Sequence, residues 1–367
     1  MDRRRLIAAL AASAVPAFAS AQAAPGLGAV GARVGIGFGT AFDREVLSDA
    51  AYAALVARES RTVTVENSLK FDWLRPRGAT ADFGTADRLV DFAARNRLVL
   101  KGTPLVWNYL PPRWLRGLAS REIAATMDRH IDEVVSRYRG RVAVWDVVNE
   151  PFWPPENHPG GYRTGPWFEA MGKAFVPRAF RRAAAADPSA RLVLNEAFCE
   201  QNDALGNSVR PRLLQLVDEL KQAGVPFHAV GLQAHLKPHL PHDDAAFAAY
   251  VAELAAREVD IHITELDVDD SALPDDLAAR DRIVAERCRA FLTAVLAVPR
   301  VTTVITWHLA DRYSWYRHTP WYPEAVRRAG GTSGREPRTH LYDGNLAPKP
   351  ARAAVEAALM SRPALRL

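Results

Sequence analysis

The chain has 367 residues, of which 49% are hydrophobic and 24% charged, and its formal net charge is +5 at pH 7. These proportions are typical of a globular protein and exclude a disordered or fibrous chain. The small excess of Lys and Arg is spread along the sequence, so no nucleic-acid partner is expected.

The N-terminus resembles an export signal. Three arginines at 3–5 precede an apolar run at 8–19, and small residues at 19–23 offer a cleavage site. We therefore predict a signal peptide at 1–23, and a location in the periplasm or outside the cell. The arginines followed by Leu6 and Ile7 also resemble a twin-arginine signal, although Asp2 stands where Ser or Thr is usual. The apolar run is too short to form a stable membrane anchor.

Residues 24–367 alternate between short apolar or β-branched runs and longer stretches with helical periodicity, which is typical of parallel βα units. Eight runs are predicted to be strands: Val34–Gly37, Thr62–Glu66, Leu98–Thr103, Val142–Asn149, Leu192–Glu196, Ala229–Gln233, Asp260–Glu265 and Val301–Trp307. Predicted helices between them include Glu45–Glu59, Arg121–Tyr138, Arg212–Ala223 and Asp281–Leu296.

Eight βα units close most naturally into a (β/α)8 TIM barrel, which is an α/β fold. No linker interrupts the series, so 24–367 is predicted to be a single catalytic domain. A doubly wound open sheet is the alternative topology. The glycines at 35, 37 and 39 lack the full spacing of a dinucleotide-binding turn, and they fit a closely packed first strand better.

Cysteine and histidine usage indicates neither a disulfide framework nor a metal site. Cys199 and Cys288 are the only cysteines, and their spacing leaves open whether they pair. His235, His239 and His242 lie in a segment with two prolines, and no carboxylate or cysteine completes a metal-binding set. No metal and no cofactor is expected.

Two predicted strands end in a carboxylate. Glu150 follows an apolar run in Trp145–Pro151, and Glu265 follows one in Ile263–Asp267. The strand ends of a barrel meet at one mouth, where catalytic groups lie. Breaking a glycosidic bond requires a proton donor at the leaving oxygen and an anion facing the oxocarbenium ion. The pair therefore predicts glycoside hydrolysis, and the separation that decides between inversion and retention is not readable from sequence.

Six motifs resemble those of the glycoside hydrolase family 10 xylanases, in the same order and over nearly all of 24–367. They are Val65–Phe71, Trp145–Pro151, Gly231–Leu236, Ile263–Asp267, Thr306–Trp315 and Lys349–Ala351. The resemblance implies a retaining endo-1,4-β-xylanase that acts on β-1,4-xylan or a xylan-like polysaccharide through a covalent glycosyl-enzyme. It assigns Glu150 as acid/base and Glu265 as nucleophile.

The resemblance also implies which residues bind the polysaccharide. They are Glu66, Asn67 and Lys70 on the glycone side of the bond, with Trp107, Asn149, Gln233, His235, Trp307 and Trp315. Asn149 is expected to donate to the sugar 2-OH, and His235 to bridge Glu265 and the supporting Asp267. The tryptophans supply flat faces for sugar C–H surfaces.

Structural alternatives remain open for several of these residues. Glu66, Asn67 and Lys70 could form a solvated turn, and Gln233 and His235 could be satisfied core groups. Asp311 is interpreted as structural rather than ligand-binding.

The sequence departs from the family pattern near the expected cleavage point. Two family histidines, one of which binds the sugar there, are replaced by Thr103 and Asn108, and His308 stands where glycine is usual. Asn195–Ala197 replaces the family's Asn-Asp-Tyr. The same chemistry on another glycan, such as a bacterial exopolysaccharide or β-glucan, is therefore an alternative. A non-catalytic exported carbohydrate-binding protein is another.

The segment 315–338 is too long for an ordinary barrel loop and could extend the cleft as a lid. Its Trp321 and Tyr322 could stack on sugars or fix the segment in place. A monomer is expected.

Overall fold

The computed structural model describes residues 25–363 of the chain. The predicted signal peptide at 1–23 lies outside the described residues and stays a prediction. Within the described range, no helix combines the length and apolar character needed to cross a membrane.

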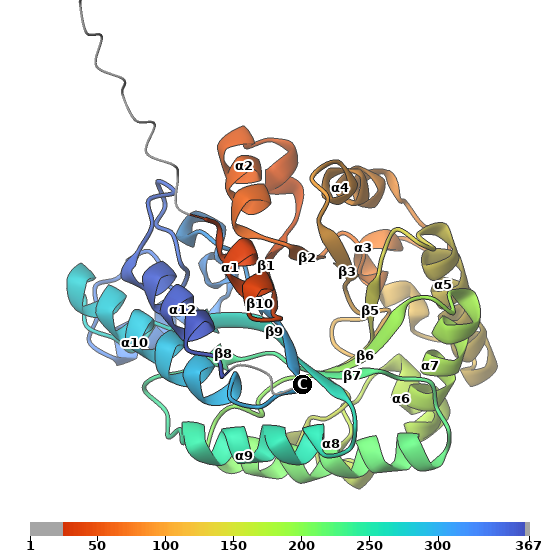
Figure 1. The fold of residues 1–367 in the computed structure, drawn as a ribbon. Helices are drawn as coiled ribbons and strands as arrows, with labels where there is room; N and C mark the ends of the chain where they lie inside the picture. The colour runs from red at the N-terminus through yellow and green to blue at the C-terminus, as the bar shows by residue number, and fades with distance from the viewer. Residues whose placement is uncertain (1–24, 364–367) are drawn as a thin grey trace, which may run out of the picture.

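Eight parallel strands of the described chain form a closed barrel (Figure 1). They are β1 (Gly37–Phe42), β2 (Thr62–Val65), β3 (Val99–Gly102), β5 (Val144–Asn149), β6 (Arg191–Glu196), β7 (Ala229–Leu232), β9 (Asp260–Val268) and β10 (Val301–Thr306). Neighbours in this order are hydrogen-bonded, and β10 pairs with both β9 and β1, which closes the sheet. Two short strands, β4 (Val106–Trp107) and β8 (His235–Leu236), pair with the last residues of β5 and with the C-terminal part of β9. The predicted single-domain (β/α)8 barrel is confirmed.

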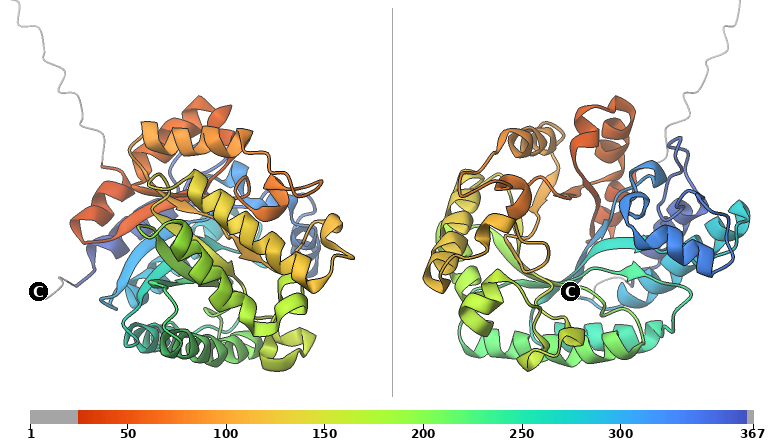
Figure 2. Two further views of the ribbon diagram at one scale, coloured as in Figure 1. Left: turned by 90° about the vertical axis from the view of Figure 1, so that its right-hand side faces the viewer. Right: turned by 180° about the vertical axis from the view of Figure 1, so that it is seen from behind.

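Helices surround the strands on the outside (Figures 1 and 2). They are α1 (Leu27–Arg33), α2 (Ala50–Glu59), α3 (Phe71–Leu74), α4 (Gly84–Arg95), α5 (Ser120–Arg137), α6 (Pro166–Met171), α7 (Phe175–Ala186), α8 (Ala204–Gln222), α9 (Asp244–Ala255), α10 (Leu277–Val295), α11 (Trp321–Arg328) and α12 (Pro350–Met360). Short 3-10 turns are η1 (Arg44–Leu47), η2 (Arg113–Leu115), η3 (Pro154–Glu156), η4 (Pro159–Gly161), η5 (Gly172–Ala174), η6 (Asp311–Tyr313) and η7 (Trp315–His318).

The predicted first strand, Val34–Gly37, is wrong because that segment is mostly the turn from α1 into β1. Gly35 has a φ of +71°, which lets the chain reverse after the helix. The strand itself is the glycine-rich run that follows. A Cβ atom at Gly39 would lie 1.4 Å from the carbonyl oxygen of Thr62, so only glycine permits β1 to approach β2 so closely. The expectation of a closely packed glycine strand therefore holds for residues slightly later in the chain.

Three helices begin where an aspartate caps them rather than where the sequence pattern placed them, and one of them is α10, which starts at residue 277 after Asp276 instead of at the predicted residue 281. Asp49 accepts a hydrogen bond from the backbone N–H of Tyr52, so α2 starts at residue 50 and η1 precedes it. Asp203 caps α8 in the same way, and α8 continues through Pro211. The predicted start at residue 212 is therefore late, because a proline inside a helix was interpreted as its boundary.

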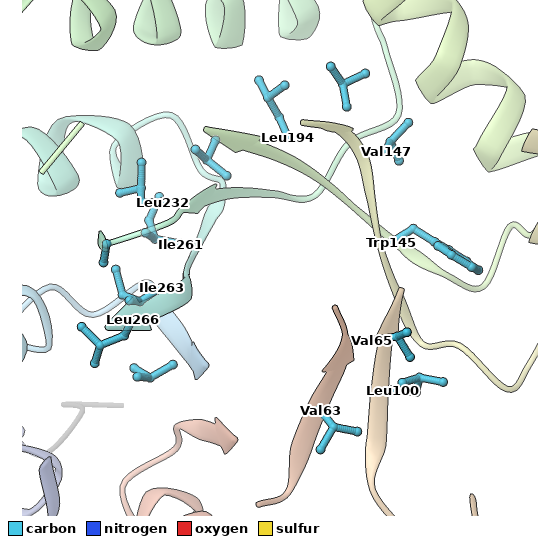
Figure 3. Packing of buried hydrophobic residues seen from close by; sticks show 14 of the residues in the cluster. Val63, Val65, Leu100, Trp145, Val147, Leu194, Leu232, Ile261, Ile263 and Leu266 are labelled. Atoms are coloured by element: carbon cyan, nitrogen blue, oxygen red, sulfur yellow. The ribbon is translucent and has the colours of Figure 1, made fainter. Parts of the chain in front are cut away.

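Strand side chains that point outward pack against the helices and form the main core (Figure 3). Val63, Leu100 and Ile261 are at most 2% exposed. Each such burial stabilises the fold by about 1.5–3 kcal/mol. The indole of Trp145 lies against Gly102 of β3, where a Cβ atom would be 2.1 Å from the ring carbon Cε3. This contact sets the spacing between β3 and β5, the strand that ends beside Glu150.

Candidate active site

The carboxyl ends of the strands surround a cleft with a volume of about 690 Å³. Its walls include both predicted catalytic glutamates and all nine residues predicted to bind the polysaccharide. These are Glu150 and Glu265 with Glu66, Asn67, Lys70, Trp107, Asn149, Gln233, His235, Trp307 and Trp315. Asp267 is fully buried behind His235. The barrel thus brings residues from seven strand ends into one cavity.

Glu150 directly follows β5, and its carboxylate is held by two long side chains. Arg163 Nη2 donates to Oε2 over 2.9 Å, and Gln233 Nε2 donates to Oε1 over 2.9 Å. Arg163 Nε also donates to the Glu150 backbone oxygen over 3.2 Å. Asn149 Nδ2 makes a longer contact of 3.4 Å with Oε1. The carboxylate is 12% exposed, so it faces the cleft while its orientation is fixed.

Glu265 lies on β9 and is held from two other strands. Asn195 Nδ2, on β6, donates to Oε1 over 2.9 Å, and His235 Nε2, on β8, lies 3.2 Å from Oε2. His235 Nδ1 is 2.9 Å from Asp267 Oδ1. Burial favours the neutral ring, but the Asp267 and Glu265 carboxylates outweigh it and raise the pKa of His235 well above its ordinary value. His235 therefore donates from both nitrogens, as the predicted bridge requires.

Asn195 connects Glu265 to Asn149, the residue before Glu150. Its Nδ2 donates to Asn149 Oδ1 over 2.8 Å as well as to Glu265, and its Oδ1 accepts from Thr264 Oγ1 over 2.7 Å. Every donor and acceptor of this buried amide is thus used near the reacting groups. The sequence identified Asn195 only as a family position. Its place at the end of the apolar run 192–194 is the same signal that identified Glu150.

Arg163 is a second residue that the sequence analysis missed. It lies in the loop between β5 and α6, and its guanidinium side chain is 7% exposed. Its carbon Cζ lies 5.4 Å from the ring centre of Tyr109 and 5.1 Å from that of Trp153. No strand-end pattern points to a loop arginine, so no signal in a single sequence could have found it.

The end of the cleft beside β2 carries Glu66, Asn67 and Lys70. Lys70 Nζ donates to Asn67 Oδ1 over 3.0 Å, and it lies 5.1 Å from the ring centre of Trp107. Asp43 Oδ2 accepts from the backbone N–H groups of Asn67 and Ser68, which fixes the loop. These residues form an ordered part of the cleft wall, so the alternative of a solvated turn is not what the structure shows.

His308 is buried behind Glu66. Its Nε2 lies 3.0 Å from Glu66 Oε2, and its Nδ1 lies 3.3 Å from the Tyr52 hydroxyl and 3.6 Å from Glu45 Oε1. Burial lowers the pKa of His308, but the Glu66 and Glu45 carboxylates reverse this and raise it to about 9. Burial raises the pKa of Glu66, and the His308 charge outweighs that effect and lowers it. An imidazolium–carboxylate pair results.

The two positions that lack the family histidines differ in their surroundings. Asn108 Oδ1 accepts from the backbone N–H groups of Trp167 and Phe168, so it caps the start of α6. The Thr103 hydroxyl is buried, and no hydrogen-bond partner for it lies in the described part of the chain. Asn108 thus has a structural function, although its side chain also borders the cleft.

The segment 315–338 forms a fixed wall of the cleft. Trp315 Nε1 donates to Asp267 Oδ2 over 2.7 Å, and the buried Tyr322 hydroxyl donates to Asp270 Oδ1 over 2.7 Å. Trp321 is 42% exposed and borders the cleft. Tyr322 therefore fixes the segment, while Trp321 is available for stacking.

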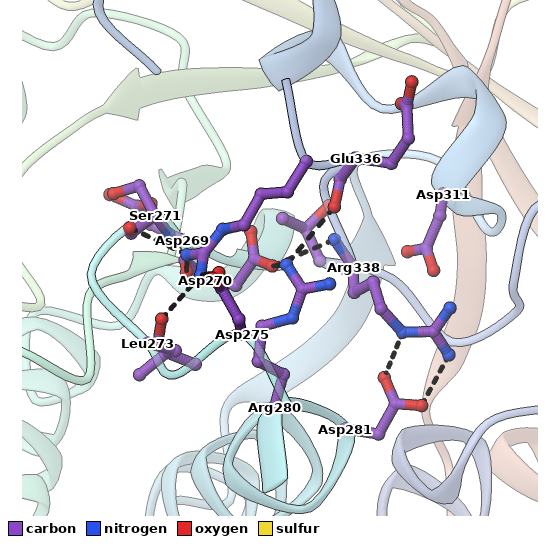
Figure 4. A network of polar contacts seen from close by, with 12 residues as sticks. Asp269, Asp270, Ser271, Leu273, Asp275, Arg280, Asp281, Asp311, Glu336 and Arg338 are labelled. Atoms are coloured by element: carbon purple, nitrogen blue, oxygen red, sulfur yellow. Dashed lines mark hydrogen bonds and ion pairs between the residues drawn. The ribbon is translucent and has the colours of Figure 1, made fainter. Parts of the chain in front are cut away.

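Arginines hold the second half of this segment to the loop after β9 (Figure 4). Arg335 donates to the backbone oxygens of Asp270, Ser271 and Leu273, and Arg338 pairs with both oxygens of Asp281. Nearby, Asp311 pairs with the buried Lys349, as expected for a structural residue. So many contacts favour a rigid wall over a lid.

Cys199 and Cys288 are both buried and free. Burial raises the pKa of the Cys288 thiol to about 12, which makes it unreactive at neutral pH. Within 25–363, no group of three or more His, Cys, Asp or Glu side chains is arranged to hold a metal ion.

Four of the nine non-glycine residues with positive φ in the described chain lie at the mouth of the barrel. Glu150, Phe198, Ala234 and His308 have φ values of +47°, +65°, +64° and +77°. Each lies within two residues of a strand end and borders the cleft or contacts a residue that does. Non-glycine residues in this region cost about 1–3 kcal/mol, and such strain persists where the fold requires a particular side-chain direction.

Two carboxylates with separate partners, in a tryptophan-lined cleft at the mouth of a (β/α)8 barrel, define a glycoside hydrolase site. The sequence profile of glycosyl hydrolase family 10 matches residues 26–358. The chain belongs to this family.

Named relatives agree with this assignment. The chain is 31% identical to a β-1,4-xylanase of Dictyoglomus thermophilum over 311 residues, which cover 82% of each protein. It is 31% identical to endo-1,4-β-xylanase C of Phanerodontia chrysosporium, over 79% of this chain and 73% of that one. The crystal structure of xylanase 10B from Thermotoga maritima superimposes with a TM-score of 0.78 at 30% identity, covering 91% of this chain and 98% of that one. The protein is a xylanase-like glycoside hydrolase.

Proposed function

We propose that the protein is a retaining endo-1,4-β-xylanase in which Glu150 is the acid/base and Glu265 the nucleophile. The observation that carries the proposal is the pairing of two carboxylates in one cleft with unlike partners. Glu265 is fixed by groups of the barrel strands, and Glu150 by an amide and a loop arginine. Family membership supports the same pair, because both residues fall in its motifs.

In the first step, Glu150 donates its proton to the glycosidic oxygen while a Glu265 oxygen attacks the anomeric carbon. The bond to the leaving sugar breaks with its electron pair on that oxygen, and a glycosyl-enzyme forms. His235 and Asn195 orient the attacking carboxylate. Asn149 Nδ2, whose only hydrogen bond to a residue of 25–363 is the 3.4 Å one to Glu150, is available to donate to the sugar 2-OH.

In the second step, Glu150 accepts a proton from water, and the hydroxide oxygen attacks the anomeric carbon and releases Glu265. Two displacements at one carbon restore its configuration. The cleft supports cleavage within a chain, because aromatic rings line it at two separate groups of strand ends: Trp107 and Trp307 follow β3 and β10, and Trp153 and Phe198 follow β5 and β6.

A second candidate is the same chemistry on another glycan, such as a bacterial exopolysaccharide or β-glucan. Thr103 and Asn108 favour it, because they replace the two histidines of the family pattern: the Thr103 hydroxyl is buried, and Asn108 Oδ1 is engaged at the start of α6. The two candidates share every catalytic residue and differ only in the polysaccharide.

Purified protein incubated with xylan, β-glucan and bacterial exopolysaccharides separates these candidates, with reducing ends measured against a Glu265→Ala control. Release of oligosaccharides from xylan supports the first candidate, and release only from another polymer supports the second. No release from any polymer would overturn both.

Retention and the nucleophile have their own test. A 2-fluoro glycosyl fluoride is expected to trap the enzyme with one added glycosyl mass on the peptide that contains Glu265. NMR of the first product should show the β-anomer. An α-anomer as first product contradicts retention. Absence of both trapping and hydrolysis favours a non-catalytic carbohydrate-binding protein instead.

We also propose that the protein is exported, which rests on the pattern of residues 2–23. N-terminal sequencing of the protein from periplasm or medium should show a start near residue 24. An intact N-terminus inside the cell contradicts export.

A further inference from the structure

Cations and aromatic rings line one wall of the cleft, with two rings between each cation and the next. In spatial order the residues are Lys70, Trp107, Tyr109, Arg163, Trp153, Phe198 and Lys237, and all of them border the cleft. Successive members lie 5.1 to 6.0 Å apart, measured from cation to ring centre or between ring centres. The row therefore forms one continuous surface.

The two lysines lie at opposite ends of this row. Lys70 follows β2, the second strand of the barrel, and Lys237 follows β8 in the loop after β7, the sixth. The second and sixth strands of a closed eight-stranded barrel face each other across the mouth. A polysaccharide that occupies the cleft therefore meets Lys70 and Lys237 on different sides of the cleaved bond.

The three cations of the row differ in their partners. Arg163 pairs with Glu150, and Lys70 donates to Asn67 and has Glu66 and Asp72 nearby. Lys237 has neither an ion pair within 4.0 Å nor a side-chain hydrogen bond to any residue in 25–363. Its charge also acts on the carboxyl of the buried Glu200, whose pKa is raised by burial. Within the described residues, Lys237 is thus a half-buried ammonium group with no carboxylate oxygen within 4.0 Å.

Phe198 supplies the surface beside this charge. Lys237 Nζ lies 6.0 Å from its ring centre, and the Trp153 ring centre lies 5.2 Å away on the other side. The left-handed backbone of Phe198, with a φ of +65°, holds the ring at the cleft wall at an energetic cost. A strained residue next to an unpaired charge indicates a binding surface rather than a chance contact.

We infer that Lys237, with the faces of Phe198 and Trp153, forms a subsite for a sugar that carries a carboxylate. The rings stack on the C–H face of the pyranose, and the ammonium group pairs with the uronate. The inference rests on the proposed function and narrows it: the preferred polysaccharide carries uronate groups on the side of the cleaved bond away from Glu66.

The test compares glucuronoxylan with the same polymer after chemical reduction of its carboxylates to alcohols, so that only the charge differs. For wild type, kcat/KM should be higher on the acidic polymer, and the ratio should fall as salt rises. Lys237→Gln should lower this ratio about tenfold, mainly through KM, and Lys237→Arg should keep most of it. Lys221→Gln, at the far end of α8, is the matched control and should leave the ratio unchanged.

An unchanged ratio in Lys237→Gln overturns the inference, as does a higher kcat/KM of wild type on the reduced polymer. Calorimetric titration of the Glu265→Ala protein, with and without Lys237→Gln, makes the test independent of hydrolysis. The subsite is supported, even where xylanase activity is not found, if adding Lys237→Gln to Glu265→Ala weakens binding of the acidic polymer more than binding of the reduced polymer. If the ratio of the affinities for the two polymers is the same in both proteins, the inference is overturned. Failure of hydrolysis alone bears only on the proposed function.

Discussion

The surroundings of Glu150 and Glu265 differ in their origin. The partners of Glu265 are an amide on β6 and an imidazole on β8, and Asp267 on the same strand as Glu265 anchors that imidazole. Glu150 has one partner beside a strand end, Gln233, and one in a loop, Arg163. The carboxylate proposed to attack the anomeric carbon is thus held by groups of the barrel strands. The carboxylate proposed as acid/base is held in part by a loop residue.

Removal of each carboxylate should give the largest effect and separate the two functions. Glu265→Ala and Glu150→Ala should each lower kcat on xylan by about 10⁴-fold, which is the scale for loss of a reacting group. On an aryl glycoside with a good leaving group, Glu150→Ala should retain much more of kcat/KM, because that oxygen leaves without a proton. With azide, Glu150→Ala should form the β-glycosyl azide with retained configuration, whereas an azide product of Glu265→Ala should have the inverted α-configuration. If Glu150→Ala loses as much kcat/KM on the aryl glycoside as on xylan, its assignment as the acid/base is contradicted.

The imidazole beside Glu265 comes next in size. His235→Asn should lower kcat by about 10²-fold with little change in KM, because it removes the group that orients the nucleophile. Asp267→Asn is the matched variant, since it leaves the ring in place and removes only its anchor. It should give a smaller loss in the same direction. Steady-state kinetics decide this, and a loss confined to KM contradicts an orienting function.

Arg163→Lys tests the loop side of the comparison. Lysine keeps the charge but cannot reach both the Glu150 carboxylate and its backbone oxygen, so kcat should fall about tenfold. Arg163→Met should give a larger loss. Thermal unfolding serves as the control for folding. If the wild type and both variants are equally active, the ion pair between Arg163 and Glu150 is not needed for activity.

His308 and Glu66 form a second imidazole–carboxylate pair, which does not react, and it should give the smallest effect. The pKa of His308 is raised to about 9, so the pair is intact below the ordinary histidine value and is lost as pH rises through about 9. Asp43, Glu45 and the Tyr52 hydroxyl are the other groups facing the ring.

KM should therefore rise about fivefold between pH 8 and 10 while kcat changes less, since a contact of this kind is worth about 1 kcal/mol. His308→Asn removes the titrating ring and retains a residue type that tolerates positive φ. That variant should show a higher KM at pH 8 and no further rise. A wild-type KM that stays flat across this range contradicts the prediction.

Much of the fold could be predicted because the strands follow a simple rule. Buried parallel strands are short apolar runs, and seven of the eight predicted strands overlap the observed ones closely. The first strand was misplaced because glycine carries no apolar signal, and the need for glycine at 39 comes from the carbonyl group of Thr62, distant in sequence. Helix starts were misplaced where a capping aspartate decided the boundary.

The candidate site divides in a similar way. Glu150 and Glu265 were predicted because position in the barrel selects strand ends, and His235 was predicted because its motif resembles that of the family. Arg163 was not found, because its function depends on a loop path that no local pattern encodes. Lys237 was visible only as part of a histidine-rich segment, and its lack of a counter-charge is a property of the folded chain.

The contact between Gly102 and Trp145 also has a consequence for how this barrel can change over time. The indole fills the space that any side chain at position 102 needs. A larger side chain at position 102 therefore requires a smaller one at position 145, so these two positions are expected to vary together among homologues. Because Trp145 lies on β5, five residues before Glu150, this shared space limits which sequences can keep the glutamate in register.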